Sequence, residues 1–562
     1  MADDGSRPSL YEALAERARL RPDRIALVLL EEEGMARTLT AGELRASAER
    51  WAAGMARLGV RQGDLIVLAL PHSVELVVAF WAALSLGALP TIFPYPSARL
   101  GPGVFQDQIE TLVVRAEAHF LLTQPDQQSE LSSRLEQLGC RVTAADSLLG
   151  QAVPIRDPLG ARARTDPRAA YVQFSSGTTG LQKGVILSHR AVLNNLQAIA
   201  GRVGLTEEDV VICWLPLNHD MGLVSGVLLP VVSGALGVLI SPFQWVRDPG
   251  VLFRAIRTYH GTICWMPNFA FNHCVHGMRE RDLEGLDLRG MRAFFNASEP
   301  VRYDSLMLFW DRFAPYGLQR RALGSSYGMA EVTAAATISP METPPRVDWV
   351  ALEDLQRDRR ATPVEAQSAG ATALVSSGRP VQGVEVQIVD GQDRPLPPRR
   401  IGQILVRSNA GLMGYRGTPP PDALDLESGW LHSGDLGYLA EGDLFVTGRI
   451  RDLIISGGRN IYPEDLETVA GGIPGLRPGR AVAFAIDDPE AGTEAIVLVA
   501  ELRETVPEAQ RLEIEREVRR RMTQTLDVTL SDLRLVGRDW VIKTSSGKVA
   551  RSANREKYLS EA

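Results

Sequence analysis

The sequence predicts an α/β protein, with a large N-terminal domain of α/β subdomains at residues 1–448 and a small α+β C-terminal domain at residues 449–562. Helical and strand patterns alternate through the first 160 residues, which is typical of a largely parallel sheet. The 562 residues are 45% hydrophobic, enough for several cores. After Gly448-Arg449, strand and helix patterns alternate again over a stretch of small-domain size.

The first elements follow from the spacing of apolar residues. Apolar positions recur at helical intervals in Leu10–Arg19 and from about Ala41 to Leu58. Continuous apolar runs predict strands at Ile25–Leu30 and Asp64–Leu70.

The strand that begins at Tyr171 runs into a loop rich in Ser, Thr and Gly, residues 175–184. Ser188 has the character of a helix N-cap, and apolar residues recur behind it at helical spacing. We therefore expect the loop to join a strand region to a helix, where backbone amides can converge on an anion.

Three later segments complete the predicted organisation. Val224–Ile240 carries no charge, but its Pro and Gly residues favour a buried helix followed by a buried strand over a membrane span. A polar segment from about Ser339 to Ala371 reads as an insertion with a short helix, and strand patterns resume at Gly383–Val389 and Gly402–Val406. In the C-terminal domain, apolar residues at i,i+4 spacing predict a helix around Ile514–Leu526.

Composition excludes several classes of protein. A net charge of -8 and a pI near 5.7 leave no basic field for nucleic acid. The four cysteines form no CxxC pair and no metal-ligand spacing, which indicates reduced packing residues and a cytoplasmic protein. The first residues lack a basic segment followed by an apolar core, so we expect no secretory signal.

Lysine is rare here, with four residues against 56 arginines. Two of the four, Lys183 and Lys548, close loops rich in Ser, Thr and Gly. A compact ammonium on a flexible stem suits a phosphate or carboxylate oxygen that moves during a reaction. The first loop is not a Walker A loop, because Gln182 and Gly184 stand where that motif requires Gly and Ser or Thr.

Further motifs lie between the two loops, in this order: residues 296–300 (NASEP), 326–331 (SYGMAE), 433–437 (SGDLG) and 448–449 (GR). Together with both loops they resemble the adenylate-forming superfamily of acyl-CoA synthetases, amino-acid adenylation domains and luciferases, over essentially the whole chain. The chain is most similar to the fatty acyl-AMP ligases, through residues 214–216 (WLP), 219–223 (HDMGL), 267–271 (PNFAF), 295–302 (FNASEPVR) and the insertion before residues 377–380 (SGRP). In those ligases such an insertion is thought to hinder the rearrangement needed to use free CoA.

The resemblance implies ATP and Mg²⁺ as cofactors and assigns roles to residues of this chain. Lys548 would be the catalytic cation for carboxylate attack on the α-phosphorus, and Glu331 would ligate Mg²⁺. Asp435 would accept the ribose hydroxyls, Arg449 would brace the ribose, and Arg451 would be the hinge. The residues expected to hold ATP are Ser175, Ser176, Gly177, Thr178, Thr179, Gly180 and Lys183 at the phosphates, with Ala297, Ser298, Glu299, Ser326, Tyr327, Gly328, Met329 and Ala330 around the adenine, on which Tyr327 would stack.

The acyl side of the site is predicted from the same resemblance. The residues expected to line it are Met221, Gly222, Asn268, Phe269 and Phe295, although aromatic residues at such spacing are also common in plain cores. His219 is either a gate for acyl entry or a structural histidine bonded to Asp220. Glu331 and Asp435 also have structural alternatives, as a carboxylate at a helix N-terminus and an aspartate in a turn.

The predicted reaction is ATP-dependent conversion of a fatty or other apolar carboxylic acid to acyl-AMP. No aspartate near residues 267–271 could pair with an α-amino group, which argues against an amino-acid substrate. The predicted acceptor is the phosphopantetheine of an acyl carrier protein, as in polyketide or lipopeptide assembly. The alternative is a CoA ligase, which Gly457-Gly458 favours and the insertion disfavours. A non-catalytic ligand-binding homologue is the remaining alternative, against which the intact motif residues speak.

Overall fold

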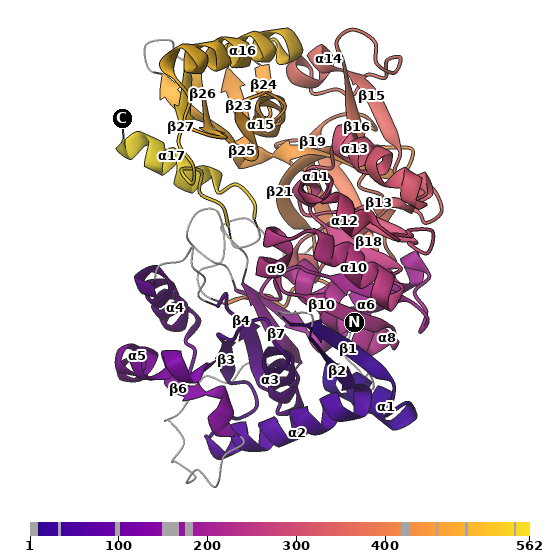
Figure 1. The fold of residues 1–562 in the computed structure, drawn as a ribbon, viewed down its shortest axis with the longest axis vertical. Helices are drawn as coiled ribbons and strands as arrows, with labels where there is room; N and C mark the ends of the chain where they lie inside the picture. Colours follow the sequence, from indigo (N-terminus) through magenta and orange to yellow (C-terminus); the bar gives the residue numbers. More distant parts are fainter. Residues whose placement is uncertain are drawn as a thin grey trace.

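The computed structural model describes residues 9–31, 35–95, 102–148, 168–174, 184–416, 428–456, 459–488, 493–544 and 547–561. Figure 1 shows the N-terminal helices and strands at one end of the molecule and the C-terminal ones, with α15 and α16, at the other. The predicted glycine-rich loop at residues 175–183 and the pair Gly457-Gly458 lie outside the described residues.

A nine-stranded sheet forms the centre of the N-terminal body, in the order β17-β14-β13-β12-β11-β9-β10-β1-β2. The six strands from β13 to β1 are mutually parallel, and the strands outside them are antiparallel. In that order the bounds are Arg379–Pro380, Ala335–Ile338, Leu323–Gly328, Ala293–Asn296, Ile263–Met266, Val210–Cys213, Leu236–Ile240, Ile25–Leu30 and Ala36–Thr40.

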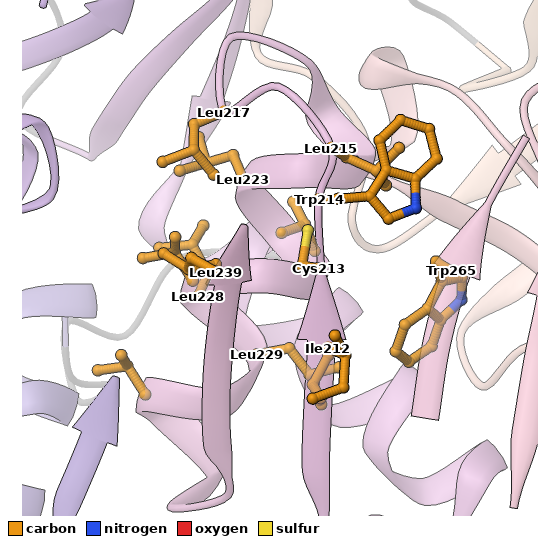
Figure 2. Close-up of a cluster of buried hydrophobic side chains, with 14 of the residues drawn as sticks. Ile212, Cys213, Trp214, Leu215, Leu217, Leu223, Leu228, Leu229, Leu239 and Trp265 are labelled. Carbon is orange, nitrogen blue, oxygen red and sulfur yellow. The ribbon is translucent and has the colours of Figure 1, made fainter. Parts of the chain in front are cut away.

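Helices pack against this sheet and bury its apolar side chains. Around β9 and β10, side chains of the helical stretch that follows His219 fill the space beside the strands, and Trp214 and Trp265 lie on the same side of β9 (Figure 2). The helices of this part are α1 Leu10–Leu20, α2 Ala41–Arg57, α3 Val74–Ser85, α6 His189–Val203, α7 Asp220–Leu223, a π-helix Val224–Leu228, α8 Leu229–Ser233, α9 Pro242–Arg247, α10 Gly250–Tyr259, α11 Asn268–Gly277, α12 Glu280–Leu283 and α13 Tyr303–Phe313.

Three sheets of three or four strands also belong to the described part of the body. A four-stranded parallel sheet, β4-β3-β5-β6, confirms the prediction of a parallel sheet in the first 160 residues; its bounds are Leu89–Ile92, Leu65–Leu68, Phe120–Thr123 and Arg141–Ala144, with α4 Pro102–Ala116 and α5 Pro125–Leu135 beside it. An antiparallel sheet β18-β19-β21-β22 spans Val384–Val389, Gly402–Ser408, Leu431–Ala440 and Asp443–Arg449. A three-stranded sheet β20-β8-β7 spans Gly414–Arg416, Gly184–Ser188 and Ala169–Phe174.

That three-stranded sheet corrects one prediction. The residues after Lys183 form strand β8, which pairs antiparallel with both β7 and β20, and only then does α6 begin, capped by Ser188. Val185 and Leu187 are fully buried and make this segment a strand. The glycine-rich loop therefore connects two antiparallel strands and does not lead directly into a helix N-terminus.

The predicted insertion contains a helix, as expected, and also a strand. Strand β15, Val347–Ala351, pairs with β16, Ala371–Val375, and α14, Leu352–Arg357, follows β15 directly. Figure 1 shows α14 next to the end of α16 of the C-terminal region. Leu352 packs against the C-terminal hydrophobic cluster, so the insertion contacts that region directly.

The C-terminal region has its own hydrophobic cores. One contains Ile514, Val518, Met522 and Leu526, which confirms the helix predicted from their spacing. The elements are β23 Ile454–Ser456, β24 Arg459–Ile461, α15 Pro463–Gly471, β25 Leu476–Asp488, β26 Thr493–Leu502, α16 Glu508–Leu526, β27 Asp532–Val536 and α17 Arg551–Ser560. The cysteines are all free and buried, as expected of packing residues. None of the described helices combines the length and apolarity needed to cross a bilayer.

Candidate active site at the carboxyl edge of the parallel strands

The predicted site residues gather where four neighbouring parallel strands end. His219 follows β9, Phe269 follows β11, Ser298 follows β12, and Tyr327 is the next-to-last residue of β13. The carboxyl ends of parallel strands meet at one edge of a sheet, which is where open α/β sheets bind ligands. Segments more than 100 residues apart in the sequence therefore form one site.

A pocket lies at this edge and is lined by both polar and apolar residues. Of the predicted residues, Met221, Ala297, Ser298, Ser326 and Gly328 line it. The remaining lining residues were not predicted: Ile199, Asp220, Val224, Ser225, Leu229, Trp265, Ala334 and Ala335. Apart from Asp220 and Ser225, their only signal in the sequence was an apolar character shared with many core positions.

Two lining residues have tightly constrained backbone positions. A Cβ atom at Gly328 would lie 1.6 Å from the carbonyl oxygen of Ala334, so only glycine fits there. Ser298 has a φ of 68°, in the left-handed region that residues with a side chain seldom adopt. Its hydroxyl donates to the sulfur of Met221, 3.8 Å away, which ties the turn after β12 to α7.

Asp435 and its partners form a polar cluster at the end of β13, where Tyr327 lies between the lining residues Ser326 and Gly328 in the sequence. The Tyr327 hydroxyl donates to Oδ2 of Asp435 at 2.7 Å, and Nε of Arg449 donates to Oδ1 at 3.1 Å. Asp435 and Arg449 face each other in the β21–β22 ladder, which fixes their pairing. Burial, together with the adjacent Asp435 carboxylate, holds the pKa of Tyr327 well above its usual range. Asp435 is 8% exposed, and a carboxylate has lone pairs left after two such bonds.

Lys548 reaches this cluster from the C-terminal region. Burial lowers the pKa of Lys548, as does the Arg449 guanidinium, while Asp220, Glu299 and Asp435 oppose the shift. The side chain is half-buried. One ammonium group therefore interacts with three carboxylates, which come from the start of α7, the turn after β12 and strand β21.

Asp220 is the residue that the sequence did not assign to the site. It lies 2.7 Å from Nδ1 of His219, and the backbone N–H of Met221 donates to Oδ1 at 2.7 Å. Its burial favours the neutral acid, but His219 and Lys548 favour the carboxylate, and the net effect lowers the pKa of Asp220. His219 is the N-cap of α7 and bonds Asp220, which is the structural alternative considered for it.

Glu331 lies in the short 3-10 helix Ala330–Val332, beside the strand that follows the glycine-rich loop. The Tyr415 hydroxyl donates to Oε1 of Glu331 at 3.3 Å, and Tyr415 pairs with Val185 of β8. Burial and this carboxylate raise the pKa of Tyr415. Among the residues that the structure describes, no three His, Cys, Asp or Glu side chains gather into a metal site. Glu331 is thus a single carboxylate placed near the end of that loop.

Three residues expected on the acyl side, Asn268, Gly222 and Phe295, are not among the lining residues of this pocket. Asn268 accepts from Asn296 at 2.8 Å and from the backbone of Arg302 at 3.0 Å, so its side chain ties α11 to the neighbouring strand. Gly222 lies where a Cβ would come within 2.2 Å of a backbone oxygen. Phe295 is fully buried and stacks on Trp265, with ring centroids 5.0 Å apart, so it supports a residue of the lining.

The C-terminal region is held against the body near the predicted hinge. Arg451 lies in the 3-10 helix Ile450–Asp452, where burial and Arg449 lower the pKa of its guanidinium. Arg302 of the body and Asp465 of α15 form an ion pair of 2.6 Å. These contacts belong to the orientation in which Lys548 faces the pocket.

Comparison with known proteins identifies the family that has this arrangement. The family model described as AMP-binding enzyme matches residues 14–416. The chain belongs to the AMP-binding enzyme family. It is 31% identical to a 4-hydroxyphenylalkanoate adenylyltransferase of Mycobacterium tuberculosis, over 99% of this chain and 92% of that protein. It is 32% identical to the long-chain-fatty-acid–AMP ligase FadD26 of Mycobacterium marinum, over 99% of this chain and 98% of that protein.

Solved structures agree with the family assignment. A structure from a study of fatty acyl-adenylate ligases of E. coli and L. pneumophila superposes with a TM-score of 0.89 at 27% identity, covering 100% of this chain and 98% of the other. An L. pneumophila fatty acyl-adenylate ligase in complex with acyl adenylate and pyrophosphate gives 0.72 at 28% identity, with the same coverage. The protein has the adenylate-forming enzyme fold and is an acid-activating ligase that uses ATP.

Proposed function

We propose that this enzyme converts a fatty or other apolar carboxylic acid and ATP to acyl-AMP and pyrophosphate, and then transfers the acyl group to the phosphopantetheine thiol of an acyl carrier protein. The observation that carries the first step is that Lys548 interacts electrostatically with Asp435, Arg449 and Asp220, and Asp220 lines the pocket. Attack of a carboxylate on the α-phosphate brings two anions together, and a fixed ammonium lowers that barrier electrostatically.

The polar residues around the site then have roles in binding ATP. Asp435 accepts the ribose hydroxyls on the lone pairs that Tyr327 and Arg449 leave available, and Tyr327 presents its ring to the adenine. Residues 175–183 would hold the β- and γ-phosphates. Glu331, near the end of that loop, is the ligand for Mg²⁺, which suits one carboxylate combined with phosphate oxygens.

The lining of the pocket supports an apolar acid. Aliphatic side chains and Trp265 form much of the lining. Asp220 is the carboxylate of the lining, and its charge is already compensated by His219 and Lys548. An α-ammonium group would have no carboxylate of its own there, and burying it unpaired is costly. The names of the relatives, a hydroxyphenylalkanoate adenylyltransferase and a long-chain-fatty-acid–AMP ligase, favour the same substrate class.

The insertion favours a carrier protein over free CoA. We place the domain boundary at residues 448 and 449, so that the lid, residues 449–562, turns about Arg451 between the two half-reactions. Asn460 of the lid donates to the backbone of Gln356 in α14 at 2.8 Å and accepts from Arg359 at 2.9 Å. Arg459 also donates to Gln356. Each bond contributes about 0.5–1.5 kcal/mol, so together they resist lid rotation.

The four cysteines support a reducing compartment such as the cytoplasm, because all are free and buried.

Product analysis tests the proposal. The purified enzyme is incubated with ATP, Mg²⁺, CoA and a series of acids from acetate to long-chain fatty acids. Acyl-AMP should accumulate with little acyl-CoA. Replacing Asn460 with alanine should raise acyl-CoA formation without changing pyrophosphate release, whereas efficient acyl-CoA formation by the unmodified enzyme would make it a CoA ligase.

A further inference from the structure

Lys548, the proposed catalytic residue, lies on a short hairpin of which the structure describes residues 543, 544 and 547–549. Lys543 and Val549 form an antiparallel bridge at its base. The N–H of Thr544 donates to the oxygen of Lys548 at 2.8 Å, and the N–H of Gly547 donates to the oxygen of Thr544 at 2.9 Å. Gly547 has a φ of 85°, which closes the turn. Because these bonds hold Lys548 within the turn, the position of its ammonium depends on what the hairpin rests against.

The hairpin rests on the ring of Phe269. A Cβ placed on Gly547 would lie 3.1 Å from Cε1 of that ring, so the Gly547 backbone is close to it. The ammonium of Lys543 lies 5.5 Å from the ring centroid, within cation–π range. Phe269 thus touches the residue before Lys548 and the residue at the base of the hairpin.

The ring is rigidly held from the side of the body. It meets the edges of Trp214 and Trp245, each with centroids 6.2 Å away, and these two indoles stack 3.5 Å apart. The backbone N–H of Phe269 donates to Oε2 of Glu299 at 3.0 Å, which fixes the first turn of α11. Both the ring and its backbone are therefore held in place.

We propose that Phe269 is a positioning residue for adenylation: its ring seats the hairpin that presents Lys548. This differs from the role expected from the sequence, a wall of the acyl pocket, and Phe269 is absent from the pocket lining. The proposal rests on the proposed function of Lys548. It concerns the first half-reaction alone, because the lid turns away from this orientation before thiol attack.

The test replaces Phe269 with leucine, which keeps apolar bulk and removes the aromatic face. We expect kcat for pyrophosphate release to fall between about threefold and thirtyfold, the range that a cation–aromatic contact supports. The KM for the acid should not change. Thioester formation from supplied acyl-AMP and free pantetheine should also be unchanged, and Phe269→Tyr should retain activity. Phe243→Leu is the matched control, because Phe243 is 53% exposed on α9.

A double variant distinguishes the positioning role of Phe269 from the proposed role of Lys548. In a Lys548→Ala background, Phe269→Leu should cause no further loss, because the residue acts through that lysine. A full additional loss in that background, a raised KM for the acid, or an equal loss in thioester formation would overturn the positioning role of Phe269. Unchanged pyrophosphate release by Lys548→Ala itself would instead overturn the proposed role of Lys548. Thermal unfolding of each variant checks that loss of folding is not the cause of any difference.

Discussion

Replacing Lys548 with alanine should slow adenylation by a factor of about 100 to 1,000. Lys548 interacts with the carboxylates of Asp220, Glu299 and Asp435 and with the Arg449 guanidinium. Removing its ammonium makes the charge around these carboxylates one unit more negative, and the acid and the α-phosphate must still enter the site. Loss of one preorganised contact to transition-state charge costs about 2.7–4 kcal/mol, which is the stated factor.

The assay is pyrophosphate release under saturating ATP and acid, followed by single-turnover measurement of acyl-AMP. Lys557→Ala is the matched control. Lys557 donates to the backbone oxygen of Trp540 at 3.0 Å and lies over its ring, so the same substitution is made on the same lid outside the pocket. Near-normal pyrophosphate release by Lys548→Ala, with Lys557→Ala also normal, would refute the electrostatic argument.

Three further predictions concern ATP, the pocket wall and the lid. Asp435→Asn should raise the KM for ATP about tenfold or more, because a bond to a charged group contributes about 1.5–3 kcal/mol; an unchanged KM would contradict the ribose role. Gly328→Ala should lower the melting temperature strongly, since its Cβ would clash with Ala334, whereas Gly290→Ala, with no atom within 4 Å of the added Cβ, should not. Burial raises the pKa of Glu467 from 4.5 to about 7, so its contribution to stability is present at low pH and is lost as pH rises through 7. Glu467→Gln should therefore gain stability relative to the unmodified enzyme between pH 5 and 8, and parallel melting curves across that range would contradict this.

Much of the fold could be predicted from local patterns. Strand β1 and helix α2 begin at the predicted residues because their apolar spacing and capping residues are local properties. Strand β8 was missed because its pairing with β20, more than 200 residues away, is visible only in three dimensions. A short apolar segment between a glycine-rich loop and a helix cap gives no sign of that partner.

The site shows the same division between local and long-range information. Motif residues such as Asp435 and Tyr327 could be named from the sequence, but their direct bond could not, because it joins β13 to β21. Asp220 was taken only as a partner for His219, since its closeness to Lys548 depends on the orientation of the lid. Phe269 was expected beside the substrate from the family resemblance, and its contact with the hairpin depends on that same orientation.

The most direct test of the account is mass spectrometry of the products formed from ATP, Mg²⁺, CoA and a panel of acids. The account predicts acyl-AMP from an apolar acid, little acyl-CoA, and acyl transfer when a phosphopantetheinylated carrier protein is added. Absence of any acyl-AMP or pyrophosphate across the whole panel would contradict the proposal that this site, with Lys548 as its cation, adenylates a carboxylic acid.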